Sequence, residues 1–127
     1  MSFTNFLETE ILDHVFAGAA YTAPTTKYLA LFTAIADGET GSVTELSGSA
    51  YARQTVAFTT SGNTTSNNAA IEFPTATGSW GTVTHVGVFD ASSSGNLMAY
   101  ATLSASKAIA TGDVFRVPSG DLDITLD

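Results

Sequence analysis

The sequence predicts a mainly β fold, an antiparallel β-sandwich of about seven or eight short strands with one N-terminal α-helix. Only 13% of the 127 residues are charged, so the side chains that best stabilise helices are scarce. Runs of β-branched and aromatic residues favour strands, and turn-forming residues separate these runs about every ten residues. The length fits a single domain over 1–127, with the helix at 2–17 and the sandwich at 27–126.

A hairpin formed by 82–89 and 97–103 is the expected centre of the sheet. Both segments are rich in apolar residues, and the seven residues that join them, 90–96, are small or polar. The apolar positions change parity between Val83 and Val86, so these two side chains are expected on opposite faces. Gly87 lies inside the first segment, which indicates a bulge or a close backbone approach.

The other strands are predicted at 27–35, 51–58, 69–73, 114–117 and 122–126, with a weak strand at 107–110. The segments 36–50 and 60–68 are rich in Gly, Ser, Thr and Asn and are predicted to be surface loops. Large apolar residues in strands have few places to go except a core. The expected core residues are Leu29, Leu31, Phe58, Trp80, Val86, Val88, Phe89, Leu97 and Leu103.

The predicted helix at 2–17 has an unusually wide apolar stripe. Ser2 or Thr4 is the expected N-cap, and Gly18 is the expected C-terminal stop. The stripe must pack on this subunit's own sheet, which is the favoured alternative, or on a neighbouring subunit. Its members are Phe3, Phe6, Leu7, Ile11, Leu12, Val15 and Phe16.

Charge and composition exclude several classes of function. A formal net charge of −8 and a pI near 4.3 oppose direct binding to nucleic acid. No apolar run approaches the ~20 residues of a membrane span, and acidic residues interrupt the N-terminal stretch, unlike a secretory signal. The chain has no Cys, so it has neither disulfides nor thiolate chemistry.

The search for catalytic or metal-ligating residues leaves no convincing site, so we expect no enzyme, no cofactor and no metal. His14 and His85 lie far apart, and neither has further ligands at metal-binding spacing. Glu72 and Asp90 could form a carboxylate pair, but surface acids are the commoner case. The acids at the C-terminus are expected to be solvated: Asp121, Asp123 and Asp127.

Three other residues have two interpretations each. Trp80 either plugs the end of the core, which is favoured, or is exposed and anchors an interface or a sugar. Arg53 and Arg116 are rare cations in predicted strands, and each makes either an ion pair within the subunit or one across a subunit boundary.

Five segments carry a resemblance to a known family: 5–16, 20–24, 48–53, 71–85 and 120–126. The most distinctive reads Ile-Glu-Phe-Pro-Thr-Ala-Thr-Gly-Ser-Trp-Gly-Thr-Val-Thr-His. Together they resemble a family of small virion structural proteins of tailed bacteriophages, whose members often carry the label phage tail fibre protein. The resemblance implies a non-enzymatic component of the virion, made in the cytoplasm of the host bacterium.

The sequence is short and acidic, and it has no repeat or coiled coil that could build a fibre shaft. We therefore expect a capsid decoration, or cement, protein that binds the major capsid protein as a homo-oligomer, with a trimer as the candidate form. A tail, fibre or baseplate subunit that contacts tail proteins is the alternative, and a carbohydrate-binding module comes third. The expected interface residues are Phe3, Phe6, Leu7, Ile11, Val43, Leu46 and Trp80, with 36–50 as a mobile arm.

Overall fold

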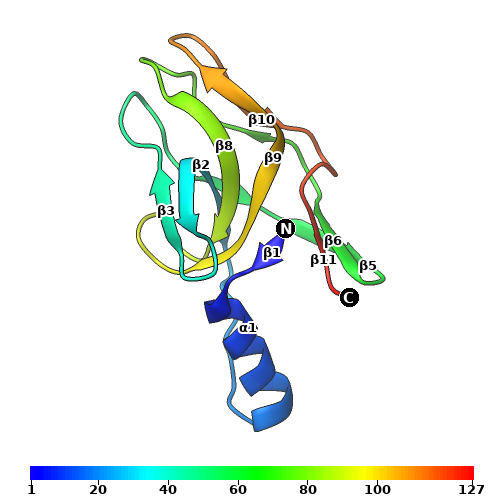
Figure 1. Cartoon of the computed structure of the whole chain (residues 1–127). Coiled ribbons are helices and arrows are strands. Elements are labelled where there is room, and N and C mark those ends of the chain that lie inside the picture. Colours follow the sequence, from blue (N-terminus) through cyan, green and yellow to red (C-terminus); the bar gives the residue numbers. More distant parts are fainter.

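The computed structural model describes all residues from 1 to 127. It contains eleven strands, one α-helix and one π-helical turn. The strands form three antiparallel sheets in a sandwich-like arrangement (Figure 1). The prediction of a mainly β fold with one N-terminal helix is therefore confirmed. The structure has more strands than predicted, because several very short segments pair.

The main sheet has six strands. In spatial order, five of them are β1 (Ser2–Phe3), β9 (Leu97–Ile109), β8 (Gly81–Phe89), β2 (Lys27–Asp37) and β3 (Ser42–Glu45). The sixth strand, β4 (Gln54–Val56), pairs with β2 at Lys27–Leu29, next to the region that pairs with β3. The predicted central hairpin, β8 with β9, therefore lies inside the sheet, as expected.

The second layer consists of two small sheets. One joins β5 (Phe58–Ser61), β6 (Thr64–Asn67) and β11 (Asp123–Thr125), and the other joins β7 (Ile71–Glu72) and β10 (Arg116–Val117). Figure 1 shows β5, β6 and β11 to the right of the main sheet, with the C-terminus near the N-terminus. The N-terminal amine donates a hydrogen bond to the carbonyl oxygen of Asp123, at 3.1 Å, which ties the chain ends together.

Strand β2 is buried on both faces of the main sheet. Leu29 and Leu31 belong to the large core between the layers, while Ala30 and Phe32 belong to a smaller cluster on the opposite face. Gly87 makes room for that cluster. A Cβ atom at this position would lie 2.7 Å from the Phe32 ring, well inside van der Waals contact. The expected close backbone approach at Gly87 is confirmed.

A large bulge interrupts the pairing of β8 with β9. Val83 faces Lys107 and His85 faces Thr102, so two steps along β8 correspond to five along β9. The irregularity shifts the parity of β8, and Val83, Val86 and Val88 all belong to the large core. The expectation that Val83 points away from the other two valines is wrong. The predicted segments 97–103 and 107–110 form one continuous strand.

Both predicted loops contain strands, so these two predictions are wrong. Segment 36–50 includes β3, and segment 60–68 includes most of the β5–β6 hairpin, which turns at Gly62 with a φ of +63°. Polar residues lie on both faces of this hairpin, so its sequence does not show the alternation of apolar and polar residues that indicates a strand. Thr64 and Thr125 share a hydrogen bond across the sheet, which shows how threonine side chains hold it together.

Seven of the nine expected core residues are buried. The two exceptions are Phe58 and Leu103, which are only half-buried and pack at the edge of the core. Phe58 begins β5, and Leu103 lies in the part of β9 where the pairing with β8 is interrupted. Burial of these side chains therefore contributes less to stability than the sequence predicted.

Candidate assembly surface

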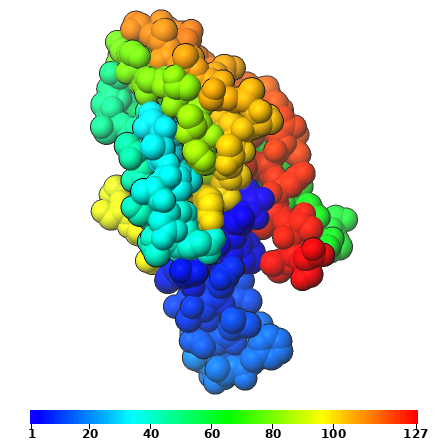
Figure 2. Space-filling model, in the orientation of Figure 1, coloured from blue at the N-terminus to red at the C-terminus, as the bar shows by residue number.

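The N-terminal helix forms a projection that we call the helix lobe, residues 5–26. It consists of α1 (Asn5–Leu12), the π-helical turn Asp13–Ala17 and an extended return segment, 18–26. Figure 2 shows the lobe extending away from the body of the molecule. The predicted helix at 2–17 therefore begins later than expected, because Ser2 and Phe3 pair with β9 as strand β1.

The root of the lobe is fixed by a buried threonine. Thr4 is 1% exposed, and its hydroxyl donates to the carbonyl oxygen of Leu97 at 2.6 Å. The hydroxyl oxygen of Thr4 also accepts a hydrogen bond from the amide of Leu7, so Thr4 is the N-cap, as expected. The amide of Asn5 donates to the carbonyl of Glu39. Three segments far apart in the sequence therefore meet at the root.

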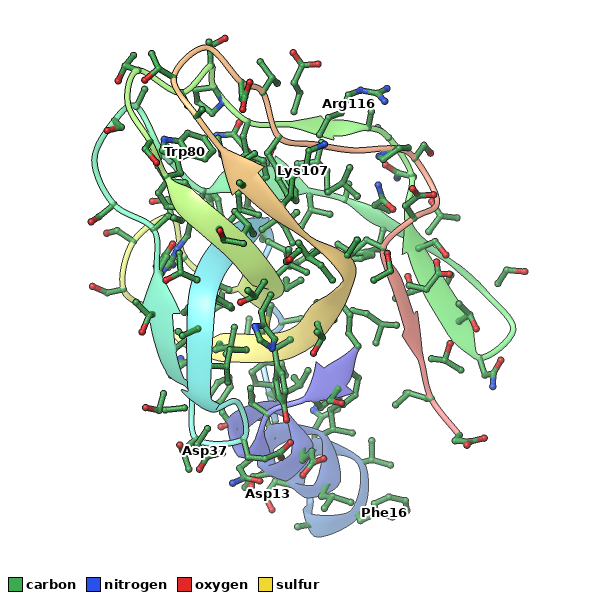
Figure 3. All side chains as sticks on the ribbon, turned by 45° about the horizontal axis from the view of Figure 1, so that its top comes forward. Asp13, Phe16, Asp37, Trp80, Lys107 and Arg116 are labelled. Carbon is green, nitrogen blue, oxygen red and sulfur yellow. The ribbon has the colours of Figure 1, made fainter.

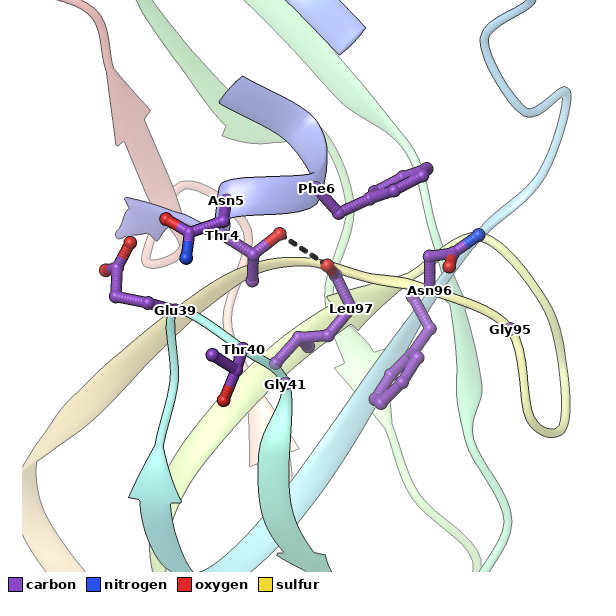
Figure 4. A pocket seen from close by; sticks show the side chains of 10 residues that line it. Thr4, Asn5, Phe6, Glu39, Thr40, Gly41, Gly95, Asn96 and Leu97 are labelled. Carbon is purple, nitrogen blue, oxygen red and sulfur yellow. Dashed lines mark hydrogen bonds between the residues drawn. The ribbon is translucent and has the colours of Figure 1, made fainter. Parts of the chain in front are cut away.

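A shallow hollow of about 320 Å³ lies at this root (Figure 4). The close-up shows Thr4 directed at the carbonyl of Leu97, with the turn at Glu39–Gly41 on one side. The lining is mostly polar, and it is supplied by the start of the helix and by two turns of the main sheet. The hollow is a junction between segments that hold each other, and it contains no catalytic constellation.

The return segment runs back along the helix through two contacts of Tyr21. Its amide donates to Nδ1 of His14 at 3.0 Å, and its ring packs edge-on against Phe6 at 6.4 Å between centroids. The helix ends at Gly18, whose φ of +75° is left-handed, so the predicted stop is confirmed. These contacts hold the lobe to itself. The lobe is held to the body by its first turn, which packs on the core through Phe6 and Leu7, and by the Tyr21 hydroxyl, which reaches Sδ of Met98 on β9 at 3.9 Å.

The far end of the helix is not covered by the rest of the chain. Leu12, Val15 and Phe16, which we call the lobe tip, are 57%, 59% and 82% exposed. No residue of α1 or of the π-helical turn is fully buried. The favoured prediction, a helix that packs its apolar stripe on its own sheet, is therefore wrong beyond the first turn. Three large apolar side chains at the end of the lobe are therefore left in contact with solvent.

The seven expected interface residues do not form one surface. Phe3, Phe6, Leu7 and Ile11 are half-buried along the lobe and its root, and Val43 is half-buried on β3. Leu46 and Trp80 are buried in the large core. The sequence placed the three lobe-tip residues in the apolar stripe but not among the interface residues. The last helical turn contains no Lys or Arg, and this absence was the sequence signal that could have identified the three lobe-tip residues as interface residues.

Trp80 plugs the core, as favoured from the sequence. Its ring is 5% exposed and packs edge-on against Tyr51, and its Nε1–H donates to the carbonyl of Ser49 at 2.9 Å. Tyr100 lies elsewhere, with its ring over Gly38, where a Cβ atom would come within 2.4 Å. The aromatic groove that a carbohydrate-binding module would build from Trp80 and Tyr100 is therefore absent.

Arg53 makes an ion pair within the subunit. Its guanidinium donates two hydrogen bonds of 2.8 Å to the Glu45 carboxylate and lies 3.6 Å above the Phe89 ring. It also donates to the carbonyls of Ala91 and Ser94. The segment 36–50 is thus clamped to the 91–96 turn, so the expected mobile arm is wrong. Arg116 makes no ion pair and lies opposite Glu72 in the pairing of β10 with β7.

Carboxylates surround the root of the lobe. The Tyr100 hydroxyl donates to Glu39, and this hydrogen bond, burial and the charges of Glu39, Asp37 and Glu8 raise the pKa of Tyr100 to about 12. Burial, followed by the charges of Asp90 and Glu10, raises the pKa of Tyr21. Acids from three separate segments therefore act on the same small region.

No other cluster in the molecule offers a chemical site. No group of three or more His, Cys, Asp or Glu residues is placed to hold a metal ion. Asp90 accepts hydrogen bonds from the amide and the side chain of Asn96, which shapes the turn between β8 and β9. The structure has no helix of the length and hydropathy that a membrane crossing requires.

These features define a class: a small β-rich protein that projects an apolar helical lobe from a well-packed body. A family model described as "Podophage GP4 fiber I protein gp80" matches residues 2–125. The chain therefore belongs to this family of phage virion structural proteins of the tail-fibre type. No curated protein matches the chain. The resemblance inferred from the sequence is confirmed, and so is the location in the virion.

Proposed function

We propose that the protein is a structural subunit of the tail-fibre apparatus of a phage particle and attaches to it through the helix lobe. The family match over almost the entire chain supports a fibre protein. The observation that carries attachment through the lobe is the exposure of Leu12, Val15 and Phe16 at its tip. A helix that is fixed to the body at its first turn and exposes apolar side chains at its other end can insert those side chains into a partner protein.

The sequence ranked capsid decoration first, and the ranking is now reversed. The family description names a fibre protein, and no feature of the structure favours the capsid shell. A fibre shaft needs length, which repeats or a coiled coil would supply. The longest strand has 13 residues and no element repeats, so the protein fits a compact unit at one end of a fibre.

The proposed role is non-enzymatic. Each ionisable group with a strongly perturbed pKa is a tyrosine in a structural contact. Tyr51 lies beside a hollow that Glu45 and Arg53 also line, but its hydroxyl is engaged by the Glu45 carboxylate and the amide of Leu31. Attachment needs only buried area and charge complementarity. The expected homo-oligomer, with a trimer as the candidate form, stays a prediction that sedimentation velocity on the purified protein tests directly.

Deletion of the gene followed by electron microscopy of the particles tests the proposed function. We expect filled heads of normal heat stability, with fibres missing or shortened and adsorption to the host reduced. Complementation with the wild-type gene should restore both. Particles with intact fibres whose heads break at lower temperature would instead support capsid decoration.

A further inference from the structure

The lobe tip has a charge environment that restricts what can cover it. Leu12, Val15 and Phe16 lie in the last turns of a helix whose other exposed side chains include Glu8 and Asp13. The first 26 residues contain no Lys or Arg. Figure 3 shows Asp13 and Phe16 on the lobe, with Asp37 close to its root. The lobe that carries the apolar tip therefore has acidic side chains and no Lys or Arg.

The negative charge continues around the root of the lobe. The acids on the lobe and those that act on Tyr21 and Tyr100 make up half of the chain's twelve. They are Glu8, Glu10, Asp13, Asp37, Glu39 and Asp90. The one buried cation, Arg53, is already engaged with Glu45. A surface with this distribution attracts a positive partner and repels a negative one.

We infer that the lobe tip docks into an apolar groove rimmed by Lys and Arg on a different virion protein, and not onto a second copy of this chain. Two lobes packed together would bring like charges side by side, which costs binding energy. A helix that inserts into a groove places residues at i, i+3 and i+4 in contact, which is the spacing of Leu12, Val15 and Phe16.

The inference rests on the proposed function, because the partner is a component of the same particle. Phe16 is the expected anchor, since it is the most exposed large apolar residue of the chain and aromatic anchors dominate interface energetics. The surrounding acids select the partner by charge and set its orientation. They also make the attachment sensitive to salt.

The test measures how much protein enters particles grown from a deletion phage complemented with plasmid-borne variants. Leu12→Ser and Phe16→Ser remove the apolar contact, and Leu126→Ser is the matched control, because Leu126 is also 57% exposed but lies at the C-terminal end. Mass spectrometry of gradient-purified particles gives the copy number. We expect Phe16→Ser to lower incorporation by about tenfold or more, and Leu126→Ser to leave it unchanged.

A second pair of variants tests the charge requirement at equal change in net charge. Glu8→Lys with Asp13→Lys reverses the charge around the lobe tip, and Asp121→Lys with Asp127→Lys makes the same change on exposed acids elsewhere. We expect only the first pair to reduce incorporation. Equal incorporation of the two pairs of variants would overturn the inference that Lys and Arg rim the groove of the partner protein. Normal incorporation of Phe16→Ser would overturn the docking of the lobe tip.

Two further results separate this inference from the proposed function. Absence of the wild-type protein from fibres in the particle would contradict the proposed function itself. A concentration-dependent self-association of the purified protein that Phe16→Ser abolishes would assign the lobe tip to a second copy and overturn the inference alone. Circular dichroism melting of each variant shows that the comparison is made between folded proteins.

Discussion

The centre of strand β2 and the helix lobe use apolar residues in opposite ways. Around Leu29 and Phe32 the strand is buried on both faces, and each side chain packs against neighbours from the same chain. In the lobe only the first turn and Tyr21 contact the body, and the side chains of 12–20 are exposed. The body therefore buries its apolar side chains within the chain, whereas the lobe tip leaves its apolar surface exposed to water.

The largest effect of breaking this contrast is expected at Phe32. Phe32→Ala removes a fully buried ring that packs edge-on against Phe89, and it should cost ~3–5 kcal/mol of unfolding free energy. The matched change Phe16→Ala, on a ring that is 82% exposed, should cost less than ~0.5 kcal/mol. Urea titration of both variants measures the difference. Equal losses would remove the distinction between body and lobe.

The next largest loss of unfolding free energy is expected on substitution of Arg53. Its side chain is 6% exposed, so Arg53→Ala leaves the Glu45 carboxylate without its partner and the carbonyls of Ala91 and Ser94 without a donor. A loss of ~3 kcal/mol is expected, close to the lower end for breaking a buried ion pair, because Glu45 retains some solvent contact. Arg116→Ala, at an exposed cation without an ion pair, is the control and should be almost neutral.

Leu103 is expected to show a smaller effect than the sequence indicated. A fully buried leucine would lose ~2–5 kcal/mol on truncation, but Leu103 is half-buried at the margin of the core. Leu103→Ala should therefore cost ~1–2 kcal/mol by denaturant titration. A loss above that range would mean that the edge of the sandwich is better packed than the exposure of Leu103 indicates.

Alkaline pH should weaken the fold through the tyrosines. The pKa of Tyr100 is raised to about 12, and the pKa of Tyr51 is raised further by burial, so the unfolded chain loses these protons first. Stability from these groups is complete below pH 10 and falls as pH rises through the folded pKa values. Tyr100→Phe should flatten this fall between pH 10 and 12 in urea midpoints. An unchanged slope would show that the Glu39 contact does not hold the proton on Tyr100.

Local sequence signals predicted the parts of the fold that local physics controls. Thr4 as the cap and Gly18 as the stop are set by backbone groups within one turn. The β5–β6 hairpin was missed because threonine and asparagine line both of its faces, so no alternation reveals it. Strand β3 was missed because the pairing partner of Val43, Ile35, is supplied by an earlier strand.

The assembly surface was predicted only in part for a related reason. The apolar stripe identified the helix as an interaction element, but a stripe does not show which of its residues the fold will cover. Phe6 and Leu7 are covered because Thr4 roots the first turn in the sheet, and that root depends on Leu97, far along the chain. Leu12, Val15 and Phe16 lie beyond its reach. Exposure at the tip is thus a property of the tertiary structure.

Amide hydrogen exchange in the lobe tests the central claim most directly, because it compares the same residues with and without the rest of the particle. In the free protein the amides of 9–17 should exchange by local opening much faster than those of 28–32, which require global unfolding. In purified particles the exchange of 9–17 should slow markedly while that of 28–32 stays the same. Equal exchange of 9–17 in both samples would contradict the account, because the lobe would then have gained no partner in the particle.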